Sequence, residues 1–446
     1  MEQQHMFTNR MIRNLLVPVV LEQILNSIMG TADTMMVSNV GSAALSAVSL
    51  VDSINVLLIQ AFSALAAGGA IVCAQYIGQR NYEKANMSAR QVLFIITAIS
   101  VVVSAVCLIF QKPLLRLIFG AVDADVMRAS ETYFFFTALS FPFIAAYDSA
   151  ASIFRAQENT KGAMTISMIS NIMNIGGNAV LIWVFHLGVA GAAISTLVSR
   201  IFCAVVVLWQ LRKDCQPVVV KDYLKIRPDW SMIGRILGLG IPSGIENSMF
   251  QLGKLAIQST VSTLGTAAIA AQAMTNILEN LNGIAAIGVG VGLMTIVGQC
   301  LGAGRKDEAV YYIKKLCVIA EAVIIVSCLS VYALVRPVTI LGGMESTSAE
   351  MCIHMMPWIT IVKPVVWTMA FVPGYGLRAA GDVKFSMITS CCTMWACRFC
   401  LCVFLIRVLG FGPMGVWIGM FADWTVRGII FTWRFHSRKW LEHKVI

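Results

Sequence analysis

The chain has 446 residues, of which 58% are apolar and 13% are charged, and it carries a formal net charge of +10. A soluble globular protein carries about 25% charged residues. The composition, with a mean hydropathy of +0.78, therefore excludes a soluble protein and predicts an all-α, multi-pass membrane protein. The thirteen cysteines lie mostly inside apolar runs, which predicts packed thiols rather than a disulfide framework.

The first apolar segment, Leu15–Val37, is long enough to cross a bilayer, because about 20 helical residues cover the hydrocarbon core. It also contains Glu22, Asn26 and Asp33, which share one helical face. A carboxylate near the centre of a span costs roughly 2.5 kcal/mol or more. We therefore expect this face to line a cavity, and we expect Asp33 to bind a proton or a metal cation. The short polar N-terminus has no small-residue cleavage site, so the span is predicted to be retained.

Twelve spans are predicted along the chain. They cover about 12–37, 45–77, 91–111, 131–154, 162–186, 190–211, 236–262, 268–299, 316–336, 351–377, 385–409 and 414–434. A polar, basic segment interrupts them near the middle. The sequence thus predicts an N-lobe over 1–211, a cytoplasmic linker over 212–235 and a C-lobe over 236–446.

Basic residues are distributed unevenly over the predicted loops. With the N-terminus inside, most Lys and Arg side chains fall on the cytoplasmic side. Only a few lie outside, namely Lys112, Arg116, Arg128, Arg336 and Arg407. This bias predicts that both termini are cytoplasmic. It also accounts for most of the net charge, so nucleic-acid binding is an unnecessary interpretation.

The two halves of the sequence resemble each other at a nearly constant offset of 224 residues, with one match, Arg155 and Arg378, at 223 (378 − 155 = 223). The segment from Pro18 to Glu22 is matched by the segment from Pro242 to Glu246 (242 − 18 = 224). Six spans separate equivalent positions, so both halves insert in the same sense. They are predicted to be related by a pseudo-two-fold axis along the membrane normal, as in some secondary transporters. Further pairs at this offset are Gly41 with Gly265, Gln75 with Gln299, and Gly188 with Gly412.

Several motifs follow one another along the chain: Pro18 with Gly30, Asp33 and Thr34, then Gly41–Leu45, Ala74–Gly78, Phe154–Lys161, Gly188–Ala193 and Gly240–Pro242. In this order they resemble the multidrug and toxic compound extrusion (MATE) transporters, prokaryotic type, over essentially the whole chain. The resemblance implies two six-helix lobes in a V-shaped arrangement. It also implies a monomeric antiporter of the plasma (inner) membrane, without a cofactor, that exports organic and often cationic drugs in exchange for protons or sodium ions.

The resemblance places an ion-coupling acid at Asp33. The second acid that some relatives carry in the fifth span is absent, because this segment has Asn174 and Asn178 instead. Acids expected in the seventh and tenth spans are replaced by Phe250 and Trp367, so coupling is assigned to the N-lobe. The predicted ion-coupling residues are Asp33, Asp52, Asn55, Asn174 and Asn178. Asp33 and Asn178 would be ligands if the ion is sodium, since oxygen ligands suit a hard cation.

Other polar side chains inside the spans are predicted to line the substrate path. Lys254 is expected to pair with Glu246 or Glu279, because an unpaired lysine would repel cationic substrates. For Glu22 and Glu246, which follow prolines, a structural role is an equal alternative. The predicted substrate-path residues are Glu22, Glu246, Gln251, Lys254, Asn276, Glu279 and Asn280.

Two other classes of function are left open by the sequence. A flippase for lipid-linked sugar precursors would share similar lobes, but is expected to carry more central cations and extra spans. A membrane-embedded enzyme or a channel is the other alternative. The sequence contains no phosphate-binding G-x-x-x-x-G-K-[ST] loop, so ATP-driven export by this chain is not expected. Its five histidines lie at ends or in loops, and no catalytic constellation is predicted.

Overall fold

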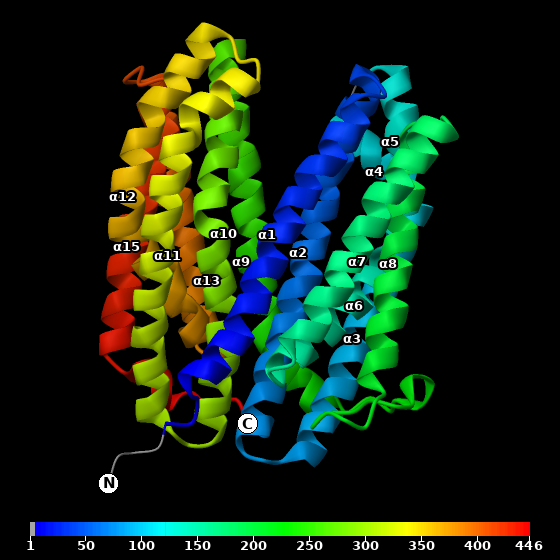
Figure 1. Ribbon diagram of the computed structural model, residues 1–446, viewed down its shortest axis with the longest axis vertical. Coiled ribbons are helices and arrows are strands. Elements are labelled where there is room, and N and C mark those ends of the chain that lie inside the picture. The colour runs from blue at the N-terminus through cyan, green and yellow to red at the C-terminus, as the bar shows by residue number, and fades with distance from the viewer. Residues whose placement is uncertain (1–4, 121) are drawn as a thin grey trace. The chain divides into compact units, whose positions relative to one another are not determined.

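The computed structural model describes residues 5–120 and 122–446, without the side chains of Thr31, Thr34 and Leu224. Thr34, part of the motif in the first span, is therefore described only by its backbone. The described residues form helices and no strands (Figure 1). In chain order the helices are α1 (Asn9–Ser38), α2 (Ser42–Gly78), α3 (Tyr82–Ile109), α4 (Gln111–Phe119), α5 (Ala124–Leu139), α6 (Phe141–Ala156), α7 (Thr160–Asn178), η1 (Ala179–Val184), α8 (Val189–Leu211), η2 (Tyr223–Lys225), α9 (Trp230–Val261), η3 (Ser262–Leu264), α10 (Thr266–Gly302), α11 (Lys306–Leu341), α12 (Ser346–Ala379), α13 (Val383–Cys392), η4 (Thr393–Cys400), α14 (Leu401–Arg407), α15 (Met414–His436) and η5 (Lys439–Glu442).

Many of these helices are long and apolar enough to cross a membrane. Nine pass this test within the described part of the chain. A tenth span arises if α5 and α6, which meet at a 43° bend, are counted together. The multi-pass membrane prediction is therefore confirmed. Each of the twelve predicted spans coincides with one or more helices, but α9 and α15 do not pass the test, and the number twelve stays a prediction.

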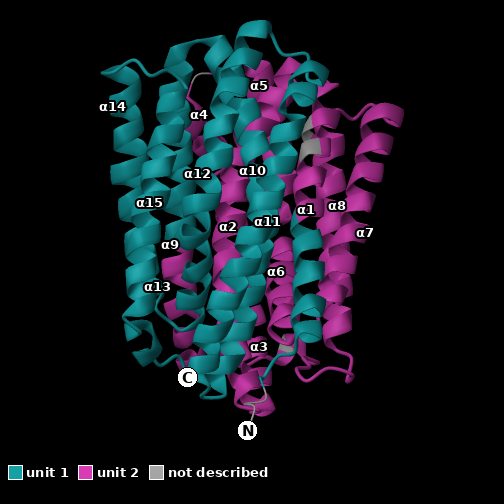
Figure 2. Cartoon of the chain, turned by 60° about the vertical axis from the view of Figure 1, so that its left-hand side comes forward, with its two compact units in different colours: residues 1–23, 245–445 teal, residues 24–244, 446 magenta. Residues whose placement is uncertain are grey.

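The chain forms two compact units. Unit 1 contains residues 1–23 and 245–445, and unit 2 contains residues 24–244 together with 446 (Figure 2). The predicted lobes were continuous in sequence, whereas the units exchange their first segments. The first half of α1 belongs with the second half of the chain, and the first half of α9 belongs with the first half.

Close helix packing explains this exchange. In unit 2, a Cβ atom on Gly68 of α2 would lie 2.6 Å from the backbone nitrogen of Gly240 in α9. In unit 1, a Cβ atom on Gly292 of α10 would strike the side chain of Leu16 in α1. These two contacts are equivalent in the repeat (292 − 68 = 224; 240 − 16 = 224). Glycine thus lets the first helix of each repeat pack against the second helix of the other.

The predicted linker packs on unit 2. Gln91 of α3 donates to the carbonyl of Arg227 at 2.7 Å and accepts from the amide of Asp229 at 3.1 Å. Asn86 of the same helix accepts from the amide of Val219 at 2.8 Å. These bonds satisfy backbone groups of an irregular segment, so the linker is part of unit 2 rather than a free connection.

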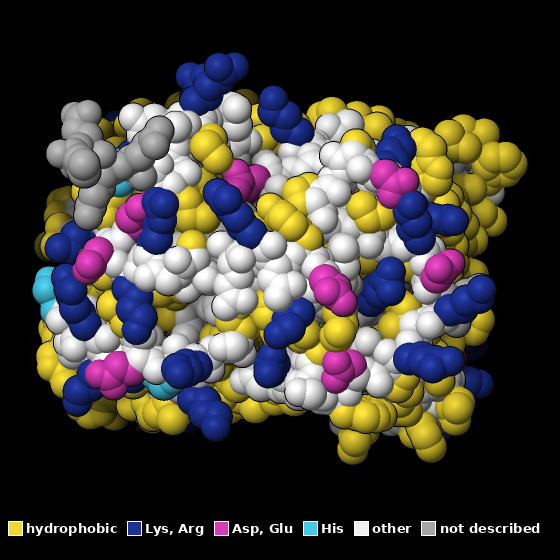
Figure 3. Space-filling model, turned by 90° about the horizontal axis from the view of Figure 1, so that it is seen from below, with side chains coloured by type: hydrophobic (Ala, Val, Ile, Leu, Met, Phe, Trp, Pro, Cys, Tyr) yellow, Lys and Arg dark blue, Asp and Glu magenta, His cyan; other side chains and the backbone are white. Residues whose placement is uncertain are grey.

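Lys and Arg side chains gather at the end of the helices where the chain termini lie (Figures 1 and 3). This distribution agrees with the loop charges that predicted cytoplasmic termini. The orientation itself stays a prediction.

Candidate functional site

Asp33 lies against α7 in unit 2. The Asn178 amide nitrogen, at the end of α7, donates to Asp33 Oδ1 at 2.7 Å. The Asn174 amide, turned so that its nitrogen faces Asp33, donates to Oδ1 at 2.7 Å and accepts from Thr196 Oγ1 at 3.3 Å. This orientation satisfies both ends of the amide, whereas the opposite one sets two oxygens against each other. Asp33 is thus held by neutral amide donors.

A second hydrogen-bonded pair between α1 and α7, here called a rung of this contact, lies two helical turns from the Asp33–Asn178 pair. Asn26 Oδ1 accepts from Asn171 Nδ2 at 2.8 Å and from Ser167 Oγ at 3.0 Å. The pairs Asn26–Asn171 and Asp33–Asn178 have the same sequence separation of 145 residues. Parallel polar faces at heptad spacing therefore join α1 to α7. The sequence indicated the α1 stripe, but Asn171 was not predicted, because nothing in one sequence shows which helices pair.

Asp52 forms a neighbouring polar cluster with groups from two other helices. It accepts hydrogen bonds from the Tyr133 hydroxyl at 3.1 Å and from Asn55 Nδ2 at 3.3 Å. Arg200 of α8 donates to Ser140 Oγ, at the α5–α6 bend, at 2.7 Å. Its charge acts on both Asp52 and Asp33, and the two carboxylates act on each other. The five predicted ion-coupling residues are therefore grouped in unit 2, although their role is not tested by this grouping.

Two buried oxygens in this region have no hydrogen-bond partner. They are Oδ1 of Asn178 and Oδ1 of Asn55. Among the ion pairs between described residues, none involves Asp33, which keeps its carboxylate available to a mobile cation. No group of three or more His, Cys, Asp or Glu side chains in the described chain is arranged to hold a metal ion. The site therefore offers the carboxylates of Asp33 and Asp52 together with amide oxygens, a set that suits a proton or a monovalent cation better than a transition metal.

The predicted substrate-path acids of unit 1 have partners other than Lys254. Glu246 of α9 pairs with Arg378 of α12 at 2.5 Å, and Glu279 of α10 pairs with Lys363 of α12 at 2.5 Å. The Lys363 ammonium, which is completely buried, also donates to the Glu279 carbonyl at 2.8 Å. No ion pair between described residues joins Lys254 to Glu246 or Glu279, because α12 supplies the partner in both cases. The charge of Glu279 still acts on Lys254.

The remaining predicted path residues are dispersed. Asn276 accepts from Gln272 Nε2 at 3.3 Å. Asn280 is exposed, Gln251 is half-buried and Glu22 is buried. No hydrogen bond or ion pair between described residues joins Asn276, Asn280 or Gln251 to the Glu279–Lys363 pair. A place on the substrate path therefore stays a prediction for these residues and for Glu22.

Lys254 and Arg398 instead meet at an aromatic ring. The Lys254 ammonium lies 5.0 Å from the centre of the Phe250 ring, and the Arg398 guanidinium lies 5.1 Å from it. Arg398 is on η4, a π-helical segment that lies inside the span Val383–Arg407. Such segments are rare and often lie at functional sites. The sequence indicated each residue separately but not their convergence.

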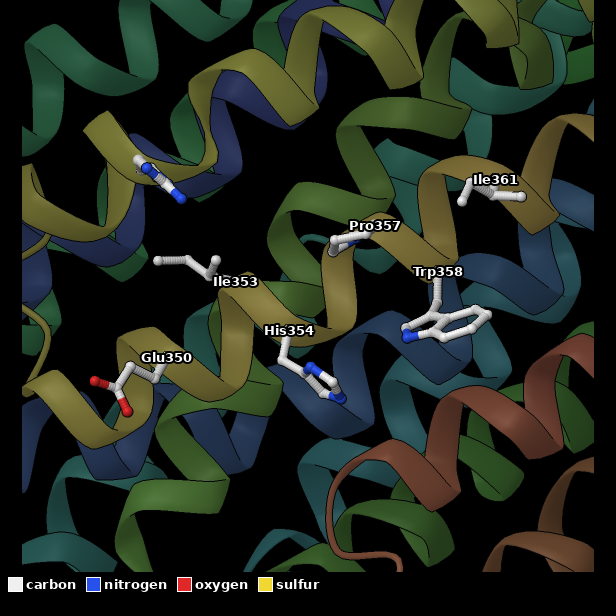
Figure 4. Close-up of a pocket in the computed structure, with 7 residues that line it drawn as sticks. Glu350, Ile353, His354, Pro357, Trp358 and Ile361 are labelled. Atoms are coloured by element: carbon white, nitrogen blue, oxygen red, sulfur yellow. The ribbon is translucent and has the colours of Figure 1, made fainter.

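Two grooves flank the exposed face of α12. One, of about 640 Å³, is lined by residues of α11 and α12 that include Arg336 and Glu350. The other, of about 540 Å³, is lined by α12 and residues around Phe411. Glu350, His354 and Trp358 project from α12 toward the first groove (Figure 4). None of the predicted site residues lines either groove.

Comparison with known proteins gives consistent matches over the whole chain. A family model described as MatE matches residues 18–180 and again 242–404. The two matches are 224 residues apart (242 − 18 = 224), the offset predicted for the internal repeat.

Two relatives align with this chain over nearly the full length of both proteins. An uncharacterized transporter, YisQ, of Bacillus subtilis is 27% identical over 431 residues, which cover 95% of this chain and 93% of the relative. A probable multidrug resistance protein, NorM, of Thermotoga maritima is 23% identical, over 97% of this chain and 93% of the relative. A solved structure of a multidrug resistance MATE family transporter, in an outward-facing conformation, superposes with a TM-score of 0.88 at 19% identity, covering 96% of each chain. That likeness shows a shared fold.

Proposed function

Because the chain belongs to the MatE family of transporters, we propose that it is a secondary antiporter that exports organic compounds in exchange for protons or sodium ions. It is proposed to work as a monomer in the plasma membrane with both termini in the cytoplasm. Relatives named as probable multidrug resistance proteins support drug export.

The observation that carries the proposal is the environment of Asp33. Its carboxylate is held by the amides of Asn178 and Asn174. A neutral donor stabilises a carboxylate without cancelling its charge, whereas a fixed arginine or lysine would occupy it permanently. A carboxylate in this environment can therefore exchange a bound cation, which is the elementary step of ion coupling.

Ion binding at Asp33 would also change the α1–α7 contact. A proton on Oδ1 removes the negative charge from the acceptor of the 2.7 Å bond from Asn178, so that bond is weakened and a rearrangement is favoured. A sodium ion would instead require carboxylate and amide oxygens, which the unpaired Oδ1 of Asn178 can supply if the amide turns. In either case the ion acts on the joint between two helices, and this links ion binding to a conformational change.

Counterflow in proteoliposomes tests the proposal. Proteoliposomes are prepared with the purified protein in the membrane and ethidium on one side. Ethidium is expected to cross the membrane in the direction opposite to the flow of protons or sodium ions down an imposed gradient. The gradient that drives this movement identifies the coupling ion. Asp33→Asn is expected to reduce ethidium movement to the rate seen without a gradient. Asp214→Asn is the matched control, because Asp214 is exposed and pairs only with Lys221 at the surface. Full gradient-driven movement in Asp33→Asn protein would show that coupling resides elsewhere.

A further inference from the structure

Two cations in unit 1 share one aromatic ring and have no carboxylate of their own. Arg398 is 5% exposed, and its Nε atom has no hydrogen-bond partner. Lys254 is exposed at the surface of the unit. Both lie about 5 Å from the ring of Phe250, at 5.1 Å and 5.0 Å. We call Lys254, Phe250 and Arg398 the cationic cluster. The ring quadrupole stabilises each cation partly, but like charges on one ring still repel.

The nearby carboxylates are engaged by other cations. Glu279 pairs with Lys363, and Asp423 pairs with Arg427 at 2.8 Å. Among the ion pairs of the described chain, none joins an acid to Lys254 or Arg398. The charge of Glu279 acts on both cations of the cluster, and that of Asp423 acts on Arg398, but each acid already has a cation of its own. Arg398, Lys363 and Arg427 are three buried cations beside these two acids, a surplus of +1 before the exposed Lys254 is counted. Buried charge in proteins is normally balanced, so the cationic cluster is able to accept a further anionic group.

Local packing holds the cluster in place. Gly253, next to Lys254, has no side chain, and a Cβ atom there would strike the side chain of Met394 in η4. This contact shows that α9 lies close to η4 at Gly253, although the end of the Met394 side chain could move. The close approach of the two elements brings Lys254 and Arg398, which are on different helices, onto the same ring.

We propose that the cationic cluster binds the anionic group, a carboxylate or a sulfonate, of an organic compound that the protein carries. This inference rests on the proposed transport function and deepens it by assigning a substrate class to unit 1. Arg398 presents planar N–H donors that match the two oxygens of a carboxylate. Lys254, which is exposed, adds a second positive charge. A purely cationic drug is repelled at this position.

Two xanthene dyes of opposite charge test the proposal. Fluorescein is anionic at neutral pH and rhodamine 123 is cationic, and their ring systems are similar. Binding of each dye to full-length protein in nanodiscs is measured by fluorescence polarisation. Lys254→Gln is expected to weaken fluorescein binding about tenfold, because a charge-assisted contact is lost. Lys254→Arg is expected to restore it, and binding of rhodamine 123 is expected not to weaken.

Lys213→Gln is the matched control, because Lys213 also lies over an aromatic ring, at 4.0 Å from Trp209, but outside the cluster. Arg398→Gln is a second variant, and Lys254→Gln alone decides the question if that buried change prevents folding. The proposal is overturned if wild-type protein does not bind fluorescein, or if Lys254→Gln and Lys213→Gln bind it equally well. Dye binding needs no gradient, so failure of ion-coupled export would leave this result interpretable.

Discussion

The two units place opposite chemistry at equivalent positions of the repeat. In unit 2, Asn174 donates to the carboxylate of Asp33. The residue equivalent to Asn174 in unit 1 is Arg398 (398 − 174 = 224), and the residue equivalent to Gly30, one turn before Asp33, is Lys254 (254 − 30 = 224). The same helices therefore carry an acid held by amides in one unit and two cations on a ring in the other. Duplication of the fold fixes the position of a site but not its charge.

The units also differ in how they neutralise buried charge. Unit 1 uses ion pairs between helices, such as Glu279 with Lys363 and Glu246 with Arg378. Unit 2 surrounds Asp33 and Asp52 with amide and hydroxyl donors. An ion pair ties its helices together permanently, whereas a carboxylate held by neutral donors is free to exchange a cation. We therefore expect the ion pairs of unit 1 to stabilise the fold and Asp33 to exchange a cation.

The largest effect is expected from breaking the Glu279–Lys363 pair. Lys363→Met removes a completely buried ammonium and leaves the Glu279 carboxylate without its cation. Loss of one partner of a buried pair costs about 3–5 kcal/mol, so the thermal unfolding temperature in detergent should fall markedly. Asp33→Asn should change it far less, because its partners are neutral.

The double variant Lys363→Met with Glu279→Gln serves as the control for this prediction. It removes both charges and is expected to recover much of the lost stability, because no isolated ion remains. Equal destabilisation by Lys363→Met and Asp33→Asn would contradict the division between stabilising and exchanging charges.

A smaller effect is expected at the helix crossings that exchange segments between the units. Gly68→Ala puts a methyl group 2.6 Å from the backbone of Gly240, which can move only with its helix. The equivalent change Gly292→Ala meets the ends of the Leu16 and Leu15 side chains, which can rotate. Overpacking costs typically about 1–3 kcal/mol, and we expect Gly68→Ala to lie at the upper end and Gly292→Ala at the lower end.

Thermal unfolding of both alanine variants checks this order. Gly244→Ala is the control, because its nearest neighbour would be an ordinary contact 3.9 Å away. If Gly292→Ala proves the more damaging of the two, the backbone contact between α2 and α9 is not the tighter crossing.

The helices, the internal repeat and the contact of Asp33 with Asn178 were predictable from the sequence, each for a different reason. The helices follow from apolar runs, and the repeat from its fixed offset. The grouping of Asp33 with Asn178 was expected from a polar stripe and a family resemblance. The exchange of segments between units was missed, because helix pairing depends on glycine contacts such as Gly68 with Gly240 that leave no pattern in hydropathy.

The ion-pair partners were missed for a similar reason. Lys254 was expected to find an acid on its own or a neighbouring span, but the α12 cations Lys363 and Arg378 occupy those acids. Sequence spacing gives the face of a helix on which a charge lies, but not which of several helices faces it. The cationic cluster could be recognised only once α9 and η4 were placed side by side.

The smallest effect on stability is expected from removing either of the two hydrogen-bonded rungs between α1 and α7. Asn26→Ala removes the acceptor of the bonds from Asn171 and Ser167, and Asn178→Ala removes the donor to Asp33. Hydrogen bonds between membrane helices are worth about 0.6 kcal/mol on average, so both variants should unfold at nearly the wild-type temperature. Ion-driven export of ethidium should separate them, because Asn178, unlike Asn26, touches the exchanging carboxylate. We expect Asn178→Ala to alter the ion concentration that gives half-maximal export, and Asn26→Ala to leave it unchanged. An equal shift in both variants would mean that the whole α1–α7 contact, rather than the Asp33 rung alone, sets the affinity for the ion.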